Sequence, residues 1–593
     1  MKIRNRKSLE KVKENGKKSL FPKKPKFRFG AASCGLGAGV EATRKAMDDA
    51  RAPEKIGRSS IVGCIGACYA EPLVELYIPR KARILYKNVQ PEEGEEIMNA
   101  AAEGLIKEDK VFCKIEEEYH IIDDEKTPLE DYPTSSEIKS PFDEDYLDEL
   151  LEKSPSINDL EYFNEQEKIV LRNTGYIDPE NIEEYIARNG YKTLYNALEM
   201  DPDDIIEKVS KSKLRGRGGA GFPTGRKWRL GKEAEGEKKY VISNGDEGDP
   251  GAYMDRVVLE SDPHSMIEGM IIGAYTIGAD EGFIFVRNEY PKAVERLEVA
   301  VEQAEEYGIL GENIMGSDFN FAITISRGGG AFVCGEETAL MSAIEGRLPT
   351  PKPRPPYPTE SGLWGKPTLI NNVKTWANIP VILNRGWKFL SQIGTKKSGG
   401  TKVFSLVGDV RRRGLIEVRM GTLLREIVEG IGDADLDEVK AVQTGGPSGG
   451  FIPTKYFDTP LDYETLNELG SIMGSGGLVV ADKNTCMVDM AKYFLDFTLS
   501  ESCGQCNPCR EGLERMLEIL NRITNGKSEE GDIELLRKLS EYVKDTSLCA
   551  LGGTAPNPVL STLDNFEEEY REHVEDKFCR AGVCDLGGDE KDE

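Results

Sequence analysis

Residues 501–512 read Glu-Ser-Cys-Gly-Gln-Cys-Asn-Pro-Cys-Arg-Glu-Gly, which places cysteines at positions 503, 506 and 509. A fourth cysteine, Cys549, follows in the segment Ser-Leu-Cys-Ala-Leu-Gly-Gly. The C-x2-C-x2-C spacing binds three irons of a cubane cluster, and a more distant cysteine binds the fourth iron. Zinc sites, the alternative, more often combine C-x2-C pairs with Cys or His partners. The spacing therefore favours a [4Fe-4S] cluster on Cys503, Cys506, Cys509 and Cys549, and a role in electron transfer.

Length and composition describe a large protein of several domains. The chain has 593 residues, and single hydrophobic cores stop growing near about 250–300 residues. Hydrophobic residues make up 39 % of the chain, and no run approaches the roughly 20 apolar residues of a membrane helix. The basic start, Met-Lys-Ile-Arg-Asn-Arg-Lys, lacks the apolar region of a secretory signal. We therefore expect a cytoplasmic protein without a membrane segment.

Charge and cysteine usage narrow the function classes further. The net charge of −27 argues against non-specific binding to nucleic acid, which requires a basic face. Twelve cysteines in a large acidic chain do not resemble a secreted disulfide scaffold. Their C-x2-C and C-x3-C spacings indicate metal ligation in a reducing compartment.

The first part of the chain divides by composition. Residues 1–29 are rich in Lys and Arg and are expected to form a basic N-terminal arm, either a mobile partner strap or simply disordered. Residues 30–95 alternate short apolar runs with a helical stretch, which predicts a small α/β domain. Residues 96–160 are acidic with scattered Pro and Ser, and are expected to form a linker.

Three glycine-rich segments indicate a bound nucleotide. Residues 214–228 carry five glycines and four cations, so backbone N–H groups and positive charge can approach a phosphate. Residues 243–256 follow a predicted strand and bring carboxylates and an amide suited to sugar hydroxyls. Residues 327–338 form a second glycine-rich turn that opens a helix with Glu336 and Glu337. Taken singly, these segments are also compatible with a flexible loop and with plain helix capping.

These motifs, in this order and with C-x2-C-x2-C downstream, resemble one family closely. It is the NADH- and FMN-binding flavoprotein subunit of respiratory complex I and its soluble relatives in hydrogenases, formate dehydrogenases and electron-bifurcating complexes. The resemblance covers about residues 165–560. It implies FMN and NAD(H) as cofactors, with hydride exchange between them and single-electron exchange between FMN and the [4Fe-4S] cluster. No protein general base is implied, because the cofactor carries the chemistry.

The resemblance also implies individual cofactor contacts. Glu336 and Glu337 would repel a 2′-phosphate, which favours NAD over NADP. Asp249 stands where many relatives carry Glu. The residues that the resemblance implies at FMN or NAD(H) are Gly216, Arg217, Gly218, Gly221, Phe222, Lys227, Asn244, Asp246, Glu247, Asp249, Gly335, Glu336, Glu337, Asn371, Asn372 and Thr375.

The implied fold is a multidomain α/β protein. A thioredoxin-like domain occupies residues 30–95, and a Rossmann-like FMN/NAD domain occupies residues 161–368. A β-grasp (ubiquitin-like) module follows at 369–465, and a four-helix-type Fe–S bundle at 466–562. Residues 563–593 form a C-terminal tail with a Cys/His site.

The N-terminal domain resembles a thioredoxin-like [2Fe-2S] ferredoxin fused to the flavoprotein. Cys64 and Cys68 supply a C-x3-C pair, but the first half of the motif supplies only Cys34 where two cysteines are normal. Either these three cysteines hold a [2Fe-2S] cluster with another ligand, or the fold has lost its cluster. Cys113, in the acidic linker, is expected to be an idle thiol.

The tail carries a second unusual set. His573, Cys579 and Cys584 resemble the segment that joins bifurcating flavoproteins to a terminal ferredoxin domain, which does not follow within this sequence. With Cys486 they are predicted to bind zinc. The alternatives are a cysteine pair that ligates a cluster together with a partner subunit, or two idle thiols.

The sequence thus predicts the NAD(H)-binding flavoprotein subunit of a soluble multi-subunit oxidoreductase, expected within an electron-bifurcating NAD/ferredoxin complex. Expected partners are other Fe–S subunits, including a [2Fe-2S] thioredoxin-like subunit, and ferredoxin. The alternatives are a simple diaphorase module without bifurcation and a non-catalytic electron-transfer scaffold.

Overall fold

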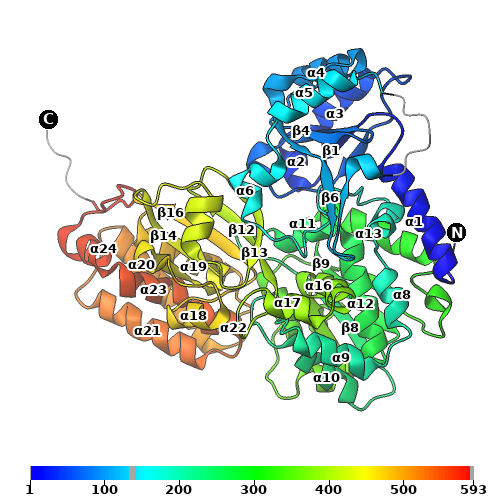
Figure 1. The fold of residues 1–593 in the computed structure, drawn as a ribbon. Coiled ribbons are helices and arrows are strands. Elements are labelled where there is room, and N and C mark those ends of the chain that lie inside the picture. Colours follow the sequence, from blue (N-terminus) through cyan, green and yellow to red (C-terminus); the bar gives the residue numbers. More distant parts are fainter. Residues whose placement is uncertain (1, 133–139, 588–593) are drawn as a thin grey trace, which may run out of the picture.

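The computed structural model describes residues 2–132 and 140–587, and it contains three main sheets and a helical C-terminal region (Figure 1). The N-terminal sheet lies at the top of that view, the parallel sheet lies below it, and the C-terminal half lies to the left. In the described part of the chain, no helix is both long and apolar enough to span a bilayer.

The N-terminal sheet has the strand order β2-β1-β3-β4-β5. Strands β1 and β2 run parallel, and the remaining neighbours run antiparallel. Helices α3 (Val40–Asp49), α4 (Pro91–Glu103) and α5 (Glu144–Lys153) pack on its core. The strands are β1 (Lys26–Gly30), β2 (Ser60–Val62), β3 (Val74–Ile78), β4 (Ala82–Tyr86) and β5 (Val111–Ile115).

The segment expected as an acidic linker belongs largely to this domain. Strand β5 pairs with β4, and the buried Leu147, Leu150 and Leu151 of α5 join the core of the sheet. A short hairpin, β6 (Glu117–His120) and β7 (Glu125–Pro128), lies between β5 and α5 in the sequence. On α5 the acidic residues occupy the exposed face and the leucines are buried, so average composition concealed this helix.

The basic N-terminal arm is an ordered helix, which corrects the expectation of a mobile or disordered segment. Helix α1 (Arg6–Leu20) packs on α7 (Ile182–Ala187), with Leu9, Val12, Gly16 and Leu20 buried. A Cβ on Gly16 would lie 1.8 Å from the carbonyl oxygen of Glu183, so only glycine permits this approach. The apolar residues recur at helical spacing between the lysines, and burial of that face fixes the helix.

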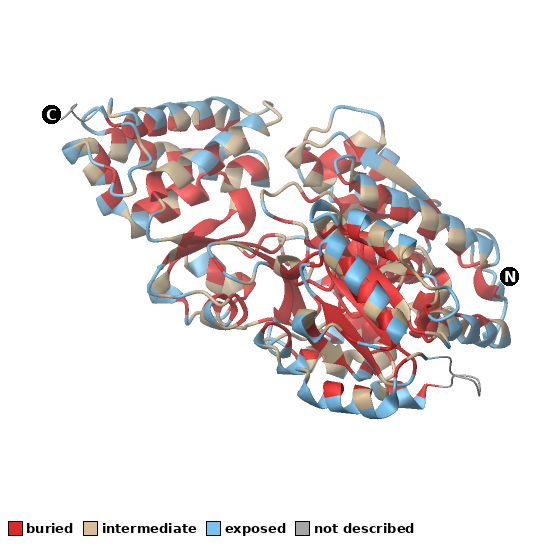
Figure 2. Cartoon of the chain, turned by 90° about the horizontal axis from the view of Figure 1, so that it is seen from above, coloured by how far each residue is buried: buried red, intermediate tan, exposed pale blue. Residues whose placement is uncertain are grey.

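The second sheet is four-stranded and fully parallel, in the order β10-β9-β8-β11. Val241 and Ile284 face the core under α12 (Pro263–Ile277) and α16 (Val373–Arg385), whereas Ile242 and Phe285 face the core under α14 (Glu337–Ile344). Figure 2 shows these strands buried between helices whose outer faces are exposed. The strands are β8 (Tyr240–Gly245), β9 (Glu281–Arg287), β10 (Ala322–Gly328) and β11 (Thr368–Asn372).

The third sheet is mixed, in the order β13-β12-β16-β14-β15. Strands β12 and β16 are parallel neighbours, and the outer pairs are antiparallel. Strand β11 belongs to the parallel sheet and β16 to the mixed sheet, so the expected module boundaries at 369 and 465 both fall too early. The strands are β12 (Thr401–Gly408), β13 (Gly414–Arg419), β14 (Val439–Thr444), β15 (Gly450–Pro453) and β16 (Gly477–Asp482).

The C-terminal region is helical and has its own core. Its main helices bury an apolar face that includes Leu495, Leu513, Leu536 and Val559. They are α19 (Met487–Ser500), α20 (Asn507–Thr524), α21 (Asp532–Thr546) and α23 (Asn557–Asn565). The short helices α22 (Ala550–Thr554) and α24 (Glu567–Arg571) connect and extend them.

Candidate flavin and iron–sulfur site

The polar loops predicted at the cofactor meet where the parallel strands end. Asn244 at the end of β8 donates from Nδ2 to the carbonyl oxygen of Gly335, at 2.9 Å. Asn372 at the end of β11 caps α16 through Lys374 N (3.0 Å) and donates to Asp255 Oδ2 (2.6 Å). Ligands of open α/β sheets bind at this carboxyl edge, so the fold places these predicted segments together.

The first glycine loop is held by a ring that the sequence did not point to. Tyr463 donates from its hydroxyl to the carbonyl oxygen of Gly216 at 2.8 Å, and Arg215 lies over the Tyr463 ring at 4.2 Å. Gly221 has φ +65°, and a Cβ there would lie 2.5 Å from the same ring. A Cβ on Gly218 would lie 3.1 Å from Asn372 Cβ. Close backbone packing therefore requires these glycines.

Arg217, predicted at the flavin, points into the protein. Its guanidinium donates to the carbonyl oxygens of Thr401 (2.9 Å) and Gly399 (2.6 Å), and the side chain is buried. Its backbone N–H donates to Thr375 Oγ1 at 2.9 Å. Arg217 and Thr375 therefore fasten the loop to α16 and to the mixed sheet, and the structure gives the guanidinium no direct phosphate role.

The carboxylates of the glycine-rich segment 243–256 make different contacts. Glu247 accepts from the backbone N–H groups of Asp255 and Arg256 at 3.0 and 3.2 Å, and burial raises its pKa to about 7. Asp249 is hydrogen-bonded to Ser475 Oγ. Both carboxylates therefore shape the loop.

Asp246 behaves differently from its neighbours. Both its carboxylate oxygens are buried without a hydrogen-bond partner in the described chain, and burial raises its pKa to about 7. A Cβ on Gly335 would lie 3.2 Å from one of these oxygens, so a glycine of the third glycine-rich segment borders the carboxylate. Unpartnered buried polar groups are rare in proteins, so this cradle of glycines and free polar atoms fits a bound ligand rich in hydroxyl groups, such as FMN.

Glu336 and Glu337 are also distinct in role. Glu336 caps α14 by accepting from the N–H groups of Thr338 and Ala339 at 2.9 and 3.0 Å. Glu337 forms ion pairs with Lys227 (3.0 Å) and Arg354 (2.8 Å). Burial alone would raise the pKa of Glu337, but these two cations outweigh burial and hold it below its usual value. Phe222, five residues before Lys227, is exposed, and the Arg226 guanidinium lies 5.5 Å from its ring centroid.

The four predicted cluster cysteines line one small cavity. Cys503 and Cys506 precede α20, Cys509 lies in its first turn, and Cys549 precedes α22. Burial raises the pKa of the Cys509 thiol to about 11, and Ser502 Oγ lies 3.3 Å from its sulfur. Four thiols around a single cavity provide the donor set of a cubane cluster, so these residues fit a [4Fe-4S] group.

One peptide connects this cavity with the sheet edge. Val333 lines the cysteine cavity, and two residues later the Gly335 carbonyl accepts from Asn244. Phe332 N donates to Glu501 Oε2 at 2.7 Å, two residues before Cys503. Residues 331–335 thus contact both the cluster cavity and the flavin cradle.

Comparison with known proteins agrees with this arrangement. Residues 209–381 match the Nuo51 FMN-binding domain, and residues 489–573 match the iron-sulfur binding region of NADH-ubiquinone oxidoreductase-F. The chain is 54 % identical over 421 residues to the HndC chain of the NADP-reducing hydrogenase of Solidesulfovibrio fructosivorans, covering 71 % of this chain and 86 % of the relative. It is 44 % identical to the F 2 chain of NADH-quinone oxidoreductase from Rhizobium meliloti (strain 1021), covering 70 % and 99 %. The chain belongs to the NADH-quinone oxidoreductase F family of flavoproteins.

A solved structure extends the likeness beyond the family's matched regions. The chain resembles a chain from the crystal structure of an NAD+-reducing [NiFe]-hydrogenase in the H2-reduced state, with TM-score 0.62, 25 % identity and coverage of 96 % and 90 %. The predicted resemblance to NADH- and FMN-binding flavoproteins is thereby confirmed. With it are confirmed an FMN-binding domain, a [4Fe-4S] region and an oxidoreductase rather than a scaffold.

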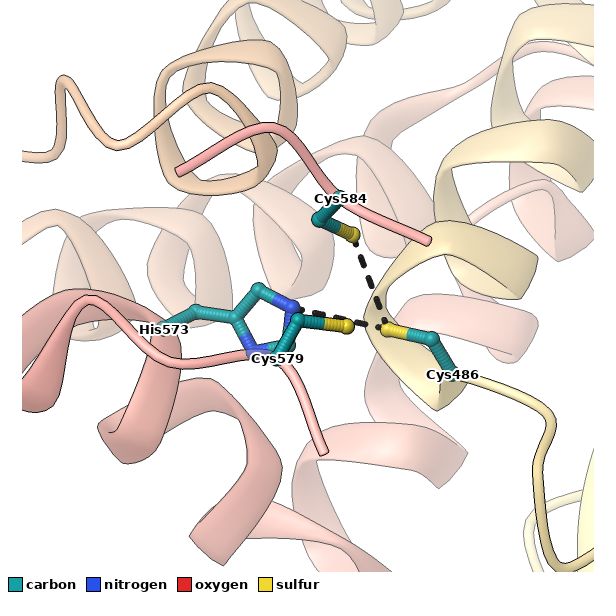
Figure 3. Close-up of side chains that lie close together, drawn as sticks. All are labelled: Cys486, His573, Cys579 and Cys584. Atoms are coloured by element: carbon teal, nitrogen blue, oxygen red, sulfur yellow. Dashed lines mark hydrogen bonds between the residues drawn. The ribbon is translucent and has the colours of Figure 1, made fainter. Parts of the chain in front are cut away.

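The Cys/His set of the tail converges on one point in this flavoprotein (Figure 3). Cys486 Sγ lies 3.9 Å from Cys584 Sγ and 3.5 Å from His573 Nε2, and Cys579 completes a group whose ligand atoms lie within 4.8 Å of one another. Two sulfurs on one tetrahedral zinc ion lie about 3.8 Å apart, and a sulfur and a nitrogen about 3.6 Å. His573 Nδ1 contacts the Glu569 carbonyl oxygen at 2.6 Å, which orients Nε2 toward the sulfurs.

The N-terminal cysteines also converge. Cys34, Cys64 and Cys68 have sulfurs within 4.8 Å of one another. They lie outside both regions that match the family, as do Cys486, Cys579 and Cys584. Cys113, expected as an idle thiol, is buried in β5 and outside both groups.

Proposed function

We propose that this chain exchanges hydride with NAD(H) at FMN and passes single electrons through its [4Fe-4S] cluster to partner subunits. The observation that carries the proposal is the peptide 331–335, which contacts both the cluster cavity and the flavin cradle. Bound FMN supplies two-electron chemistry toward nicotinamide and one-electron chemistry toward the cluster. The chain's own residues position and shield it: the glycine loop gives close approach, and Asp246 offers carboxylate oxygens to hydroxyl groups.

NAD(H) is our proposed nucleotide because the chain belongs to the NADH-quinone oxidoreductase F family, although the structure weakens the argument that the sequence suggested. Glu337 is paired with Lys227 and Arg354, and Glu336 caps a helix, so simple repulsion of a 2′-phosphate is weaker than expected. The names of relatives point both ways, to NADH-quinone oxidoreductase and to an NADP-reducing hydrogenase. The exposed Arg354 makes a direct comparison of NADH and NADPH the informative test.

We propose an assembly of the soluble, electron-bifurcating type, in the cytoplasm, with ferredoxin and Fe–S subunits as partners, one of them a [2Fe-2S] thioredoxin-like subunit. The fused N-terminal domain and the tail cysteines Cys579 and Cys584 support this assignment, because they lie outside the two regions that match the family. A simple diaphorase module is the alternative. The two differ in whether NADH-dependent ferredoxin reduction requires a second electron acceptor.

The strand orders support the proposed domain types. The order β2-β1-β3-β4 with a parallel first pair supports a thioredoxin-like domain. A mixed sheet with β12 parallel to β16 between two antiparallel pairs supports a β-grasp module. The four main C-terminal helices support a four-helix-type Fe–S bundle.

The function is tested on anaerobically purified protein by cofactor content and flavin bleaching. We expect one FMN, about four irons for the cubane, and loss of the flavin absorption band on addition of NADH. NADPH added in parallel reports the nucleotide preference. Protein without FMN, or flavin that neither nucleotide bleaches, would contradict the proposed function.

FMN affinity should depend on pH through Asp246. Its raised pKa of about 7 in the ligand-free fold means that it is protonated below neutral pH. Hydroxyl groups that donate to it favour the carboxylate form, so affinity should rise by up to about ten-fold per pH unit below that pKa and level off above it. Asp246→Asn should abolish the slope, whereas Glu298→Gln, at an exposed carboxylate that does not affect the pKa of Asp246, should retain it. FMN fluorescence titration from about pH 6 to about pH 8 measures both, and an unchanged slope in Asp246→Asn would refute the contact.

We further propose that Cys486, His573, Cys579 and Cys584 bind zinc and fasten the tail to α19. Cys579→Ser should remove one zinc ion per chain and expose residues 566–587 to limited proteolysis, because the ion joins segments about 90 residues apart. Cys113→Ser, a thiol outside the group, is the matched control. Wild-type protein without zinc would eliminate the site, and iron in its place would favour a shared cluster.

A further inference from the structure

The three N-terminal cysteines lie too close together for the cluster that the resemblance suggested. Cys64 Sγ and Cys68 Sγ are 3.9 Å apart, and Cys34 Sγ lies within 4.8 Å of both. A two-iron cluster divides its ligands between two irons, so thiolates on opposite irons lie farther apart than two thiolates on one. Three sulfurs this close match ligands that share one ion, for which the tetrahedral separation is about 3.8 Å.

A carboxylate stands beside the sulfurs as the candidate fourth ligand. Glu71 Oε1 lies 3.6 Å from Cys34 Sγ, the separation of a sulfur and an oxygen on one tetrahedral ion, given Zn–S and Zn–O distances of about 2.3 and 2.0–2.2 Å. Its other oxygen accepts from Leu73 N at 2.7 Å, and a Cβ on Gly30 would lie 3.1 Å from both oxygens. These contacts hold the carboxylate beside Cys34. Only the three cysteine sulfurs lie within 4.8 Å of one another, so binding of a metal ion would draw the Glu71 carboxylate toward them.

The surroundings also suit bound thiolates. Gly66 N donates to Cys64 Sγ at 3.3 Å, the kind of outer hydrogen bond that fixes a ligand atom. Lys168 Nζ donates to the carbonyl oxygen of Ile65 at 2.9 Å, which brings a cation next to Cys64. Cys68 lines an open cavity with charged residues from the loops that flank β12, β13 and β14, which gives an ion access from solvent.

We propose that Cys34, Cys64 and Cys68, with Glu71 at the fourth position, bind a single zinc ion in place of a [2Fe-2S] cluster. The site lies where three domains meet. Ser33 N donates to Glu260 Oε2 (2.7 Å), Cys64 N donates to Ser261 Oγ (3.2 Å), and Leu415 N donates to the Gly66 carbonyl oxygen (2.8 Å). The ion would hold the ligand loops against the FMN domain and the mixed sheet. Because zinc has no redox chemistry, the metal site of the N-terminal domain would hold these three domains together and carry no electrons.

The test is metal content of the full chain, purified anaerobically with its cofactors. We expect about four irons and about two zinc ions per chain, one in this group and one in the tail. The double variant Cys64→Ser/Cys68→Ser should lose one zinc and no iron. Cys579→Ser should lose the other zinc, and Cys113→Ser, at a buried thiol of the same domain, should lose neither. Cobalt(II) exchanged into Cys579→Ser should give the intense visible bands of a tetrahedral thiolate site.

Several results would overturn the inference. These are about two further irons in wild-type protein, a [2Fe-2S] EPR signal on reduction with dithionite, or a double variant that retains every metal ion. If the double variant does not fold, the iron and zinc content and the EPR spectrum of wild-type protein still decide between one ion, two irons and an empty site. Flavin bleaching by NADH is independent of all of them, so failure of this site leaves the proposed function standing.

Discussion

Cys506→Ala is expected to leave the flavin reducible by NADH but to stop the electrons there. Cys506 is one of four thiols around the cluster cavity, and the flavin cradle is built from different segments. Loss of an outer-shell partner already costs up to about 100-fold in metal affinity or activity, so loss of a direct ligand should slow NADH-dependent ferredoxin reduction by at least about 100-fold. Stopped-flow bleaching of the flavin and the EPR signal of the reduced cluster separate the two steps.

The control for this experiment is Cys113→Ala, which removes a buried thiol from the N-terminal sheet. It should retain both the bleaching and the cluster signal. A Cys506→Ala protein with the wild-type EPR signal would show that Cys506 does not hold the cluster. Loss of flavin bleaching with FMN still bound would show that reduction of the flavin by NADH depends on the cluster.

Gly221→Ala is expected to weaken FMN binding strongly. The residue has φ +65°, which costs an alanine about 1–2 kcal/mol, and the added Cβ would lie 2.5 Å from the Tyr463 ring. Overpacking of this kind costs about 1–3 kcal/mol. We expect the glycine loop to move away from Tyr463 in FMN-free protein but not when it encloses FMN. The free-energy cost should therefore lower the affinity for FMN. Together, about two to five kcal/mol correspond to roughly 30- to 4,000-fold.

Gly278→Ala provides the matched control, because Gly278 also has a positive φ, +77°, but a Cβ added there would meet no atom within 4 Å. It should lower the melting temperature slightly and leave FMN affinity unchanged. Fluorescence titration with FMN measures both variants. Equal FMN affinity in Gly221→Ala and wild-type protein would show that the loop does not close on the flavin as proposed.

The cluster cysteines could be predicted because spacing within one short segment encodes their chemistry. Cys503, Cys506 and Cys509 stand at fixed offsets, and the structure places them with Cys549 around one cavity. The glycine loops were predictable for the same reason: glycine and charge are concentrated in a few residues. Family membership then followed from the order of these motifs along the chain.

Contacts between distant segments could not be predicted in this way. Tyr463, which holds the first glycine loop, lies 247 residues after its partner Gly216. Arg217 carries the charge expected of a phosphate ligand, yet its guanidinium binds backbone carbonyls. Charge alone does not reveal the direction of a side chain. For α1 a signal was present, since Leu9, Val12, Gly16 and Leu20 lie on one helical face among the lysines.

The packing of α1 has a consequence for the order in which the chain folds during synthesis. Ile3 N donates to the carbonyl oxygen of Tyr307 at 2.7 Å, and Gly16 packs on Glu183. At about 5–20 residues per second, the ribosome needs roughly 8–33 s to deliver Glu183 of α7 after Gly16 of α1. For that interval the apolar face of the first helix has no partner, so we expect the nascent chain to occupy a chaperone before the flavin domain is complete.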